Sequence, residues 1–440
     1  MRRIYEDAAY RTPGACWWRE SAAPAALPRV SGDRRTEVAI IGGGFTGLNA
    51  ALVLANAGID ATVIDTEQPG WGASGRNGGF CCLGGSKASG KTIGQMFGTD
   101  QRVQWHKAER AAVDHVAALL SDHGIDAETH SDGETVLAHS PKAMLGVRQA
   151  AQEAEQTYGV AAEVFDRAEL RQRGLNGDFH GGMTLPIGFA LNPGKYHAGL
   201  LRAVQDANSQ VFGQTPAIAI NRDGEAWRVD TPSGSVRAQK VILATNGYSS
   251  EDVPDWLRGR YLPVQSTIIV TRPITAEEQV AQGWTSLQMC YDSRILLHYF
   301  RLMPDGRFLF GMRGGLRATP TAEAQLARKI RADFARLFPA WRDVDINHEW
   351  SGLLCLTRRL TPFAGPVPDM PGVFAAFGYH GNGVAMGSYA GARLADLVMG
   401  RAPTGPFPDF LSLPPRRFPL GSKRRVLPAP AYAVAALFDR

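Results

Sequence analysis

Cysteine is scarce in this sequence, and its pattern excludes two classes of protein. The five cysteines form no CxxC pair and no zinc spacing, and their number is odd. A sparse, odd set is typical of a reducing compartment and argues against a disulfide framework. The histidines are also scattered over expected helices and loops, without the geometry of a metal site. We therefore expect no structural disulfide and no metal. The cysteines are Cys16, Cys81, Cys82, Cys290 and Cys355.

Long apolar runs and strong charge are also missing. No segment reaches the roughly 18 uncharged apolar residues that a membrane helix needs. The two arginines near the start are not followed by the apolar segment of a secretory signal. The net charge is only +5, and no nucleic-acid motif accompanies it. These features predict a cytoplasmic protein without a nucleic-acid partner.

One basic cluster stands near the C-terminus. We interpret it as a solvated terminus, with contact to a phosphate or a membrane surface as the weaker alternative. The cluster consists of Arg416, Arg417, Lys423, Arg424 and Arg425.

Glycine, by contrast, is abundant. The chain has 49 glycines in 440 residues, many of them in short clusters, which indicates backbone that closely approaches a ligand. Apolar residues make up 44% and charged residues 20%, as in an ordinary globular protein. The length allows two domains.

The first glycine cluster lies between an expected strand and an expected helix. The strand EVAII begins at Glu37, the helix GLNAALVLANAG follows, and the next strand ends at Asp65. Gly42, Gly44 and Gly47 form GxGxxG, which permits a tight turn, close approach to a pyrophosphate and close packing of helix on strand. The helix N-terminus attracts the phosphates, and Asp65 is placed for the ribose hydroxyls. This unit predicts a dinucleotide without a 2′-phosphate.

A second glycine-rich run, GWGASGRNGGF, follows that acid directly. Its small residues allow backbone amides to reach a pyrophosphate and a ribitol chain, and Arg76 and Asn77 add donors. Gly78 and Gly79 let the chain pass close to a flat ring. An ordinary NAD site does not need such a run, so the segment favours FAD.

The chain resembles the FAD-dependent oxidoreductases of the D-amino-acid oxidase and glycine oxidase superfamily, most closely the subgroup typified by gamma-glutamylputrescine oxidase. Four segments carry the resemblance: the run from residue 42 to residue 80, VILATNGY, HYFRLMPDGRFLFGMRGG and FGYHGNGVAMGSYAGARLADLVMG. The segment GASGRNGG is typical of this subgroup.

The expected fold is α/β, with a Rossmann-like FAD-binding domain of the glutathione-reductase-like class. An α+β substrate domain built on an antiparallel sheet is inserted into it. We expect the FAD-binding domain in 33–95, 175–256 and 351–412, the substrate domain in 96–174 and 257–350, and terminal extensions in 1–32 and 413–440.

The resemblance also implies positions for the cofactor contacts. Ala217 should lie on the adenine side, Thr245, Asn246 and Gly247 beside the pyrophosphate, and the helix that begins near Val384 at the pyrimidine end of the flavin. A helix N-terminus there would stabilise the negative charge of the reduced ring. The expected cofactor residues are Gly42, Gly44, Phe45, Thr46, Gly47, Asp65, Thr66, Gly72, Ala73, Ser74, Arg76, Asn77, Gly78, Gly79, Ala217, Thr245, Asn246, Gly247, Gly381, Asn382, Gly383 and Val384.

For the substrate, we single out Tyr299, Arg301, Arg313 and His380 as candidate catalytic or binding residues. Strand alternation places Tyr299 and Arg301 on one face, with His298 on the other. An arginine there could bind a carboxylate through two hydrogen bonds. Structural pairing of each of these side chains is an equal alternative.

The expected reaction is oxidation of a C–N bond in an amine or amino acid, with hydride transfer to flavin N5. The imine is then hydrolysed, and the electrons pass to oxygen or another acceptor. One alternative is an FAD-dependent dehydrogenase of hydroxy acids or polyol phosphates that feeds a quinone, and another is a non-catalytic flavin-binding subunit. We expect non-covalent FAD, as in the subgroup; a bond to Cys355, as in some amine-oxidising relatives, is the alternative.

Overall fold

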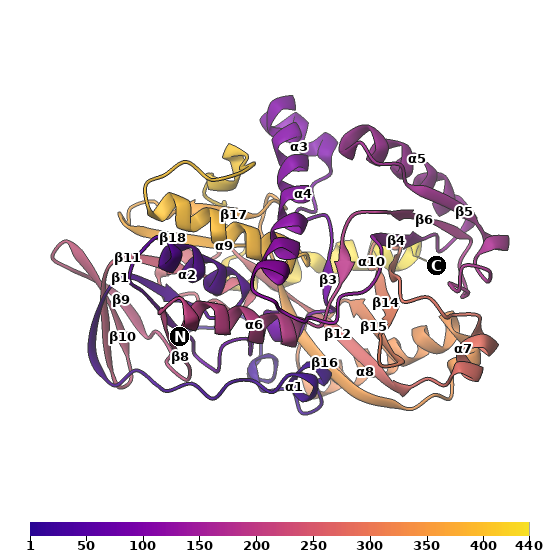
Figure 1. Ribbon diagram of the computed structural model, residues 1–440, viewed down its shortest axis with the longest axis horizontal. Coiled ribbons are helices and arrows are strands. Elements are labelled where there is room, and N and C mark those ends of the chain that lie inside the picture. Colours follow the sequence, from indigo (N-terminus) through magenta and orange to yellow (C-terminus); the bar gives the residue numbers. More distant parts are fainter. Residues whose placement is uncertain (440) are drawn as a thin grey trace.

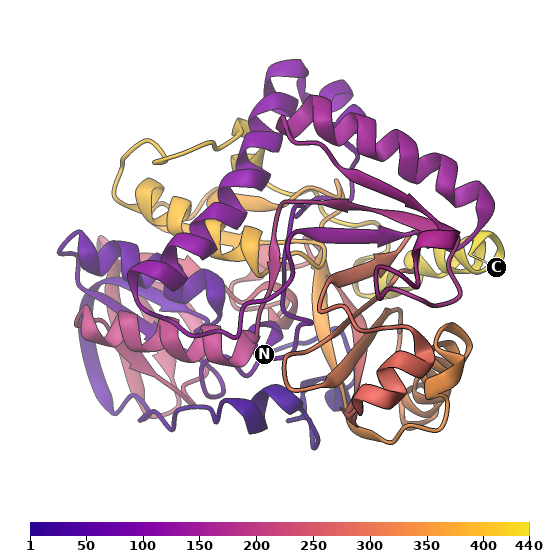
Figure 2. The ribbon, with the colours of Figure 1, turned by 45° about the vertical axis from the view of Figure 1, so that its right-hand side comes forward.

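The computed structural model describes residues 1–439. Two β-sheets form the centres of two lobes that lie side by side (Figure 1). The view turned by 45° shows α4 rising over the junction between the lobes (Figure 2).

The first sheet has the strand order β17-β18-β11-β1-β2-β8, and β10 and β9 extend it from β11 as a hairpin. Its pairs β18–β11, β11–β1, β1–β2 and β2–β8 are parallel. The strands are β1 (Gly32–Ile41), β2 (Ala61–Ile64), β8 (Gln210–Phe212), β9 (Ala219–Asp223), β10 (Ala226–Thr231), β11 (Gly234–Leu243), β17 (Phe363–Pro366) and β18 (Val373–Phe377).

Parallel strands buried on both faces explain the apolar runs seen in the sequence. Val38 to Ile41 in β1 are buried, and α2 and α9 pack together on one side of the sheet. The strand β11 pairs with β10 at its start and with β1 along its whole length.

The second sheet is mainly antiparallel, with the strand order β16-β12-β15-β14-β13-β4-β6-β5. Only its β13–β4 pair is parallel among the described residues. The strands are β4 (Glu134–Leu137), β5 (Glu163–Asp166), β6 (Gly181–Leu185), β12 (Leu262–Pro273), β13 (Met289–Asp292), β14 (His298–Leu302), β15 (Arg307–Arg313) and β16 (Ile346–Leu356). The short strands β3 (Phe80–Cys81) and β7 (Phe189–Ala190) pair with each other in a separate antiparallel sheet.

The helices begin where capping residues stand in the sequence. Ser140 and Thr319 each accept a hydrogen bond from the third backbone N–H of the helix that follows, and a proline occupies the first turn of both helices. The helices are α1 (Trp17–Ser21), α2 (Phe45–Asn56), α3 (Gly90–Phe97), α4 (Thr99–Asp122), α5 (Pro141–Tyr158), α6 (Pro193–Asp206), α7 (Ala276–Gln282), α8 (Pro320–Leu337), α9 (Ala385–Val398) and α10 (Pro428–Phe438).

The expected domain boundaries place three elements differently from the two lobes of the structure. The helix α4, expected with the substrate domain, packs on α9 and shares the core of the nucleotide lobe. The strand β6, expected with the FAD domain, pairs with β4 and β5 in the second sheet. Likewise β16 pairs with β12 along its whole length. We therefore assign α4 to the nucleotide lobe, and β6 and β16 to the substrate lobe.

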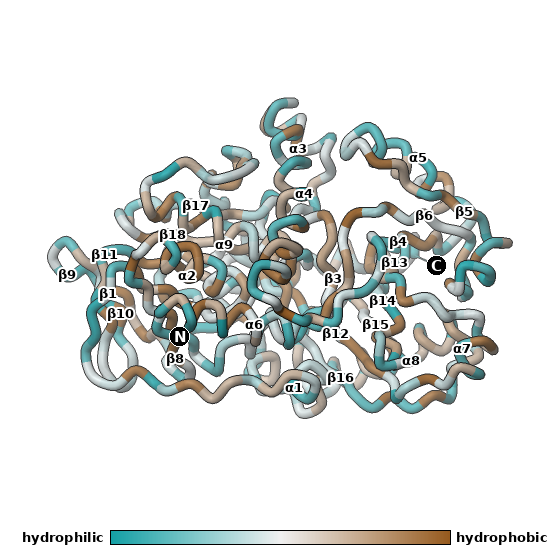
Figure 3. Tube along the Cα trace, viewed as in Figure 1, coloured by the Kyte–Doolittle hydropathy of each residue, from teal (hydrophilic) through white to brown (hydrophobic). Residues whose placement is uncertain are grey.

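The hydropathy of the chain follows this layering. Figure 3 shows α2 as a hydrophobic stretch and the turn between β9 and β10 as hydrophilic. The helix α8 has an apolar face, on which Ile330, Phe334 and Leu337 are buried and Leu326 is partly buried. Across residues 1–439, every helix is too short or too polar to cross a membrane.

The interpretation of the basic C-terminus as solvated was wrong for two of its arginines. Arg424 is fully buried, where it forms an ion pair with Glu251 at 2.5 Å and donates to the Tyr261 carbonyl at 2.8 Å. Arg425 donates to Glu6 at 2.9 Å and to the Leu316 carbonyl. These side chains fasten the C-terminal segment to the body of the protein and are not presented to an external surface.

Candidate active site

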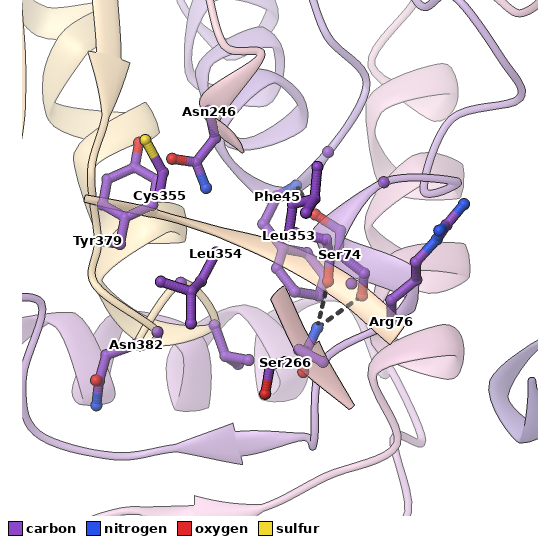
Figure 4. Close-up of a pocket in the computed structure, with 18 of the residues that line it drawn as sticks. Phe45, Ser74, Arg76, Asn246, Ser266, Leu353, Leu354, Cys355, Tyr379 and Asn382 are labelled. Atoms are coloured by element: carbon purple, nitrogen blue, oxygen red, sulfur yellow. Dashed lines mark hydrogen bonds between the residues drawn. The ribbon is translucent and has the colours of Figure 1, made fainter. Parts of the chain in front are cut away.

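A single cavity of about 400 Å³ runs from the first glycine turn to the start of α9. Figure 4 shows Cys355, Tyr379 and Asn246 at one side and Phe45, Ser74 and Arg76 at the other, with Leu354 between them. Both lobes contribute to its walls, because β15 and β16 belong to the substrate lobe and Ile41 of β1 and the start of α2 to the nucleotide lobe. The size is typical of a small-molecule site.

The GxGxxG turn joins β1 to α2 at one end of this cavity. Gly42 and Gly44 line it, whereas Gly47 lies behind them. A Cβ on Gly47 would lie 1.9 Å from the Gly42 carbonyl oxygen, so the close contact of helix and strand requires glycine here. The N-cap residue of α2, Gly44, supplies no side-chain cap, so the N–H groups that follow Phe45 in the first turn remain available for an anion.

Asp65 and Thr66 follow β2 and line the same cavity. The Asp65 carboxylate accepts hydrogen bonds from the Gly43 N–H at 2.7 Å and the Glu67 N–H at 3.0 Å. Burial raises the pKa of Asp65 to about 6, and the two N–H donors oppose this rise. The acid is thus fixed beside the turn, where a ribose would meet it.

The second glycine run closes directly on the first. The Phe45 N–H donates to Ser74 Oγ at 2.9 Å, and a Cβ on Gly44 would lie 2.8 Å from that oxygen. Gly72, Ala73 and Ser74 line the cavity beside this contact. The two glycine segments therefore form one continuous wall.

The side chains of Arg76 and Asn77 were expected to donate hydrogen bonds to the cofactor. In the structure they donate to backbone carbonyls of the protein instead. Arg76 donates to the carbonyls of Trp71 at 2.8 Å and Arg11 at 3.1 Å. Asn77 Nδ2 donates to the carbonyls of Ala73 and Ser74 at 3.1 and 2.8 Å. Both residues line the cavity, but their side chains hold the loop in shape.

The N-terminal extension braces the same loop from outside. Trp18 Nε1 donates to the Asn77 carbonyl at 2.7 Å, and Trp71 Nε1 donates to Thr12 Oγ1 at 2.9 Å. No motif in the sequence indicated this contact, because it joins segments about 60 residues apart.

Gly78 and Gly79 also serve contacts within the protein. A Cβ on Gly78 would lie 2.8 Å from the Tyr299 ring, and one on Gly79 would lie 2.0 Å from the Leu191 carbonyl oxygen. Gly78 lines the cavity, whereas Gly79 lies outside its lining. Of these two glycines, only Gly78 is placed where the chain could pass beside the flavin ring, as predicted for both.

The helix α9 starts at the other end of the cavity, as predicted near Val384. Gly381, Asn382, Gly383 and Val384 line the cavity there, and α9 has no side-chain N-cap. The α9 N-terminal turns pack on α2: Thr46 Oγ1 shares a hydrogen bond of 3.0 Å with Tyr379 and donates to the Gly387 carbonyl at 2.9 Å. Two helix N-termini thus point into one cavity.

The remaining cofactor candidates divide between two places. Thr245 and Asn246 line the cavity, whereas Gly247 is packed against the carbonyls of β16. Ala217 is buried outside the lining, although the preceding Thr215 and Pro216 line a smaller neighbouring cavity together with Thr66. Contact of Ala217 with the adenine stays a prediction.

Of the four substrate candidates, Tyr299 and Arg313 line the cavity with parts of their side chains that the protein leaves unpaired or only partly paired. Tyr299 shares a hydrogen bond of 2.9 Å with Ser266 Oγ, and burial raises its pKa to about 12. The Arg313 guanidinium reaches to 2.8 Å from where a Cβ of Gly381 would lie. No ion pair or hydrogen bond among residues 1–439 involves this guanidinium.

Arg301 does not fit the expected role. It lies on the same face as Tyr299, as predicted, but it is fully buried and outside the cavity lining. Its guanidinium donates to the Gly79 carbonyl at 2.7 Å and the Leu191 carbonyl at 2.8 Å. This arginine fixes the end of the glycine loop.

His380 lines the cavity, but its ring is engaged on both sides. Nδ1 donates to the Gly85 carbonyl at 2.8 Å, and the Thr357 N–H donates to Nε2 at 3.2 Å. Burial lowers the pKa of His380 to about 3. The ring is therefore neutral and structural, and the expectation of a catalytic role at this position is corrected.

The comparisons with known proteins agree with this geometry. The family model of FAD-dependent oxidoreductases called DAO matches residues 37–397. A probable oxidoreductase OrdL of Rhizobium meliloti (strain 1021) is 31% identical over 417 residues, covering 94% of each chain. The gamma-glutamylputrescine oxidoreductase of Escherichia coli (strain K12) is 27% identical over 391 residues, covering 89% of each chain.

The chain belongs to the DAO family of FAD-dependent oxidoreductases.

A solved structure shows the same fold. Glycine oxidase from Geobacillus kaustophilus superposes with a TM-score of 0.71 at 20% identity, and the match covers 86% of this chain and 98% of that chain. The predicted fold class, cofactor and superfamily are thereby confirmed.

The residues present suit FAD. The N-termini of α2 and α9 and the glycine wall offer backbone N–H groups for the diphosphate and the flavin, and Asp65 lies where the ribose is expected. Cys355 lines the cavity as well, but burial raises the pKa of its thiol to about 12, which disfavours the reactive thiolate. Non-covalent binding of FAD is thus the arrangement that the site favours.

Several polar residues of the cavity were missed in the sequence, and three of them lie near one another. Glu134, Tyr291 and Lys87 come from β4, β13 and the loop before α3, and they line the cavity beside Arg313. Burial lowers the pKa of Lys87 to about 7, and the charge of Arg313 lowers it further. In the sequence, nothing distinguishes the glutamate at the start of ETVLAHS from a surface residue. Only the structure shows that the whole strand β4 is buried.

Proposed function

We propose that the protein oxidises a C–N bond of an amine or amino acid and releases an imine that water hydrolyses. The observation that supports this most directly is that one cavity includes both the glycine turns and Arg313. We call the part of this cavity that is lined by Glu134, Tyr291, Tyr299 and Arg313 the substrate chamber. When bound, FAD supplies the acceptor for the hydride, and oxygen or another acceptor then removes the electrons.

The chain's own residues bind and orient the substrate. Arg313 can hold a carboxylate or another anionic group through two parallel hydrogen bonds. Tyr299, whose hydroxyl stays protonated because burial raises its pKa to about 12, forms the adjoining wall with Ser266. The reacting nitrogen must arrive neutral, since its lone pair assists hydride loss from the neighbouring carbon. Alignment and exclusion of water are then the main contributions of the protein.

An anaerobic substrate panel tests this function. Polyamines, glutamylated amines, N-methyl amino acids, D-amino acids and hydroxy acids are each mixed with the yellow holoprotein, and loss of the flavin colour is recorded. Bleaching by one of the amines is the expected result. Bleaching by hydroxy acids alone would assign the protein to the hydroxy-acid dehydrogenases, and no bleaching by either class would favour a non-catalytic subunit.

Two further measurements complete the description. Oxygen uptake after bleaching separates an oxidase from a dehydrogenase. Precipitation with acid should release the flavin into solution; a yellow pellet would show that Cys355 or another residue binds it covalently.

A further inference from the structure

Glu134 is an acidic side chain in the wall of the substrate chamber. It is the first residue of β4, where it lies opposite Met289 of β13 and Leu185 of β6. Its side chain is 6% exposed, and that exposed part faces the cavity. Because β4 is paired on both sides, the direction of this carboxylate is fixed by the sheet.

This carboxylate lacks a cation. Two other buried acids are each paired with an arginine, Glu251 with Arg424 and Asp292 with Arg294. Among residues 1–439, no ion pair includes Glu134, and its neighbours are the Tyr291 hydroxyl, the Cys82 thiol and the like charge of Glu109. Burial and Glu109 raise the pKa of Glu134 to about 8. Without a ligand the acid is therefore mainly protonated near neutral pH, and a ligand that supplies the missing positive charge would stabilise its carboxylate form.

Positive side chains lie elsewhere in the chamber. Arg313 reaches over Gly381, and Lys87 is close enough to Arg313 for the two charges to repel. The chamber thus carries both an unpaired cation and an unpaired acid, which suits a substrate with groups of both polarities.

The chemistry limits which nitrogen Glu134 can hold. A nitrogen bound as an ammonium ion by a carboxylate has a proton on its lone pair. That nitrogen cannot assist hydride loss from the neighbouring carbon, so it is not the reacting one. A cation at Glu134 therefore belongs to a second nitrogen of the same molecule.

We infer that Glu134 binds a second, protonated nitrogen of the substrate, so that the protein selects amines with two basic nitrogens over matched monoamines. This inference rests on the proposed amine oxidation. It names Glu134 as a specificity-determining residue.

The test compares Glu134→Gln with the wild type on linear α,ω-diamines, each beside the monoamine of the same chain length. Anaerobic flavin reduction gives the rate constant and the apparent affinity for every amine. We expect the variant to lose about 10- to 100-fold in kcat/KM for the best diamine, mainly through KM. Its kcat/KM for the matched monoamine should stay within about threefold of the wild type.

Glu109→Gln is the matched control. Glu109 is another buried glutamate in this region, but it lies outside the cavity lining and accepts a hydrogen bond from Tyr158 at 3.0 Å. Because the charge of Glu109 raises the pKa of Glu134, its removal favours the carboxylate form of Glu134 and should not weaken the preference for diamines. Flavin content and melting temperature establish that both variants are folded.

Equal losses on diamines and monoamines would show that Glu134 serves the reacting nitrogen, and no loss on either would show that it has no role in recognition; both results overturn the inference. If no amine reduces the wild-type flavin, the proposed function fails by itself. Calorimetric binding of the diamine to the oxidised holoproteins then still tests Glu134: weaker binding to Glu134→Gln supports the inference, and equal binding contradicts it.

Discussion

The two halves of the cavity are built in opposite ways. In the cofactor half, polar side chains are bound to other protein groups, as Ser74 is to the Phe45 N–H and Thr46 is to Tyr379. What faces the ligand there is backbone. In the substrate half, Arg313 and Glu134 have no partner of opposite charge among residues 1–439.

Because of this difference, substitutions in the two halves should have different effects on folding stability and on substrate binding. A change in the cofactor half breaks contacts that also hold the nucleotide lobe together, so it should cost folding free energy as well as FAD. A change in the substrate half removes a group that only a ligand uses, so the fold should tolerate it. The following variants test this contrast.

The largest effect is expected for Gly391→Ala in α9. A Cβ there would lie 2.1 Å from the Thr46 carbonyl oxygen, so α9 and α2 must move apart. We expect the free energy of unfolding to fall by about 3 kcal/mol, with loss of bound FAD. Denaturant unfolding and flavin absorbance measure both. Gly146→Ala in α5, where the added Cβ meets nothing within 4 Å, is the control and should be neutral or slightly stabilising. Equal behaviour of the two variants would contradict the close packing of α2 and α9.

Arg301→Met should come next. It leaves the Leu191 carbonyl without a donor and the Gly79 carbonyl with only the Leu191 N–H, at a cost of about 2 kcal/mol in unfolding free energy. The KM for an amine should not change in the protein that retains FAD. A normal stability with a raised KM would identify Arg301 as a substrate contact instead.

A smaller effect is expected from the protonation of His380. Its pKa of about 3 in the folded state lies below the ordinary value of 6.5, because burial disfavours the charged ring. The folded state therefore binds fewer protons than the unfolded one, and the stabilising contribution present above about pH 6.5 is lost as the pH falls toward 3. The difference in melting temperature between the wild type and His380→Gln should shrink from neutral pH to about pH 4. A difference that grows on acidification would show that the charged ring is the stabilising form.

Arg313→Met should have the smallest effect on the fold, within about 0.5 kcal/mol, and a large one on turnover. Substrates that carry a carboxylate should lose about 10- to 100-fold in kcat/KM, because a charge-assisted pair is removed. Arg317→Met, at an exposed position near by, is the control and should leave turnover unchanged. A strong loss of stability in Arg313→Met would show that the arginine is structural, like Arg301.

The cofactor half was largely predictable because its signals are local in the chain. The turn with Gly42, the acid at Asp65 and the helix start near Val384 each lie within a short segment, and such segments carry their own geometry. The side-chain partners were not predictable. Arg76 and Asn77 look like free donors in the sequence, and only the folded loop brings carbonyl oxygens to them.

The substrate half was predictable only in part because distant strands build it. Alternation placed Tyr299 and Arg301 on one face, but it could not show that one faces the cavity and the other the glycine loop. Glu134 reaches the chamber through the parallel pairing of β4 with β13, which joins segments more than 150 residues apart. Sequence patterns within one strand contain no record of such a pairing.

The most direct test of the central claim, that one cavity holds the flavin and a reacting amine, is a single-turnover titration. Holoprotein of known FAD content is titrated anaerobically with the best amine of the panel, while flavin colour and the carbonyl product are both followed. The prediction is complete bleaching with one carbonyl product formed per flavin. Full FAD occupancy without bleaching by any amine, or bleaching without a carbonyl product, would contradict it.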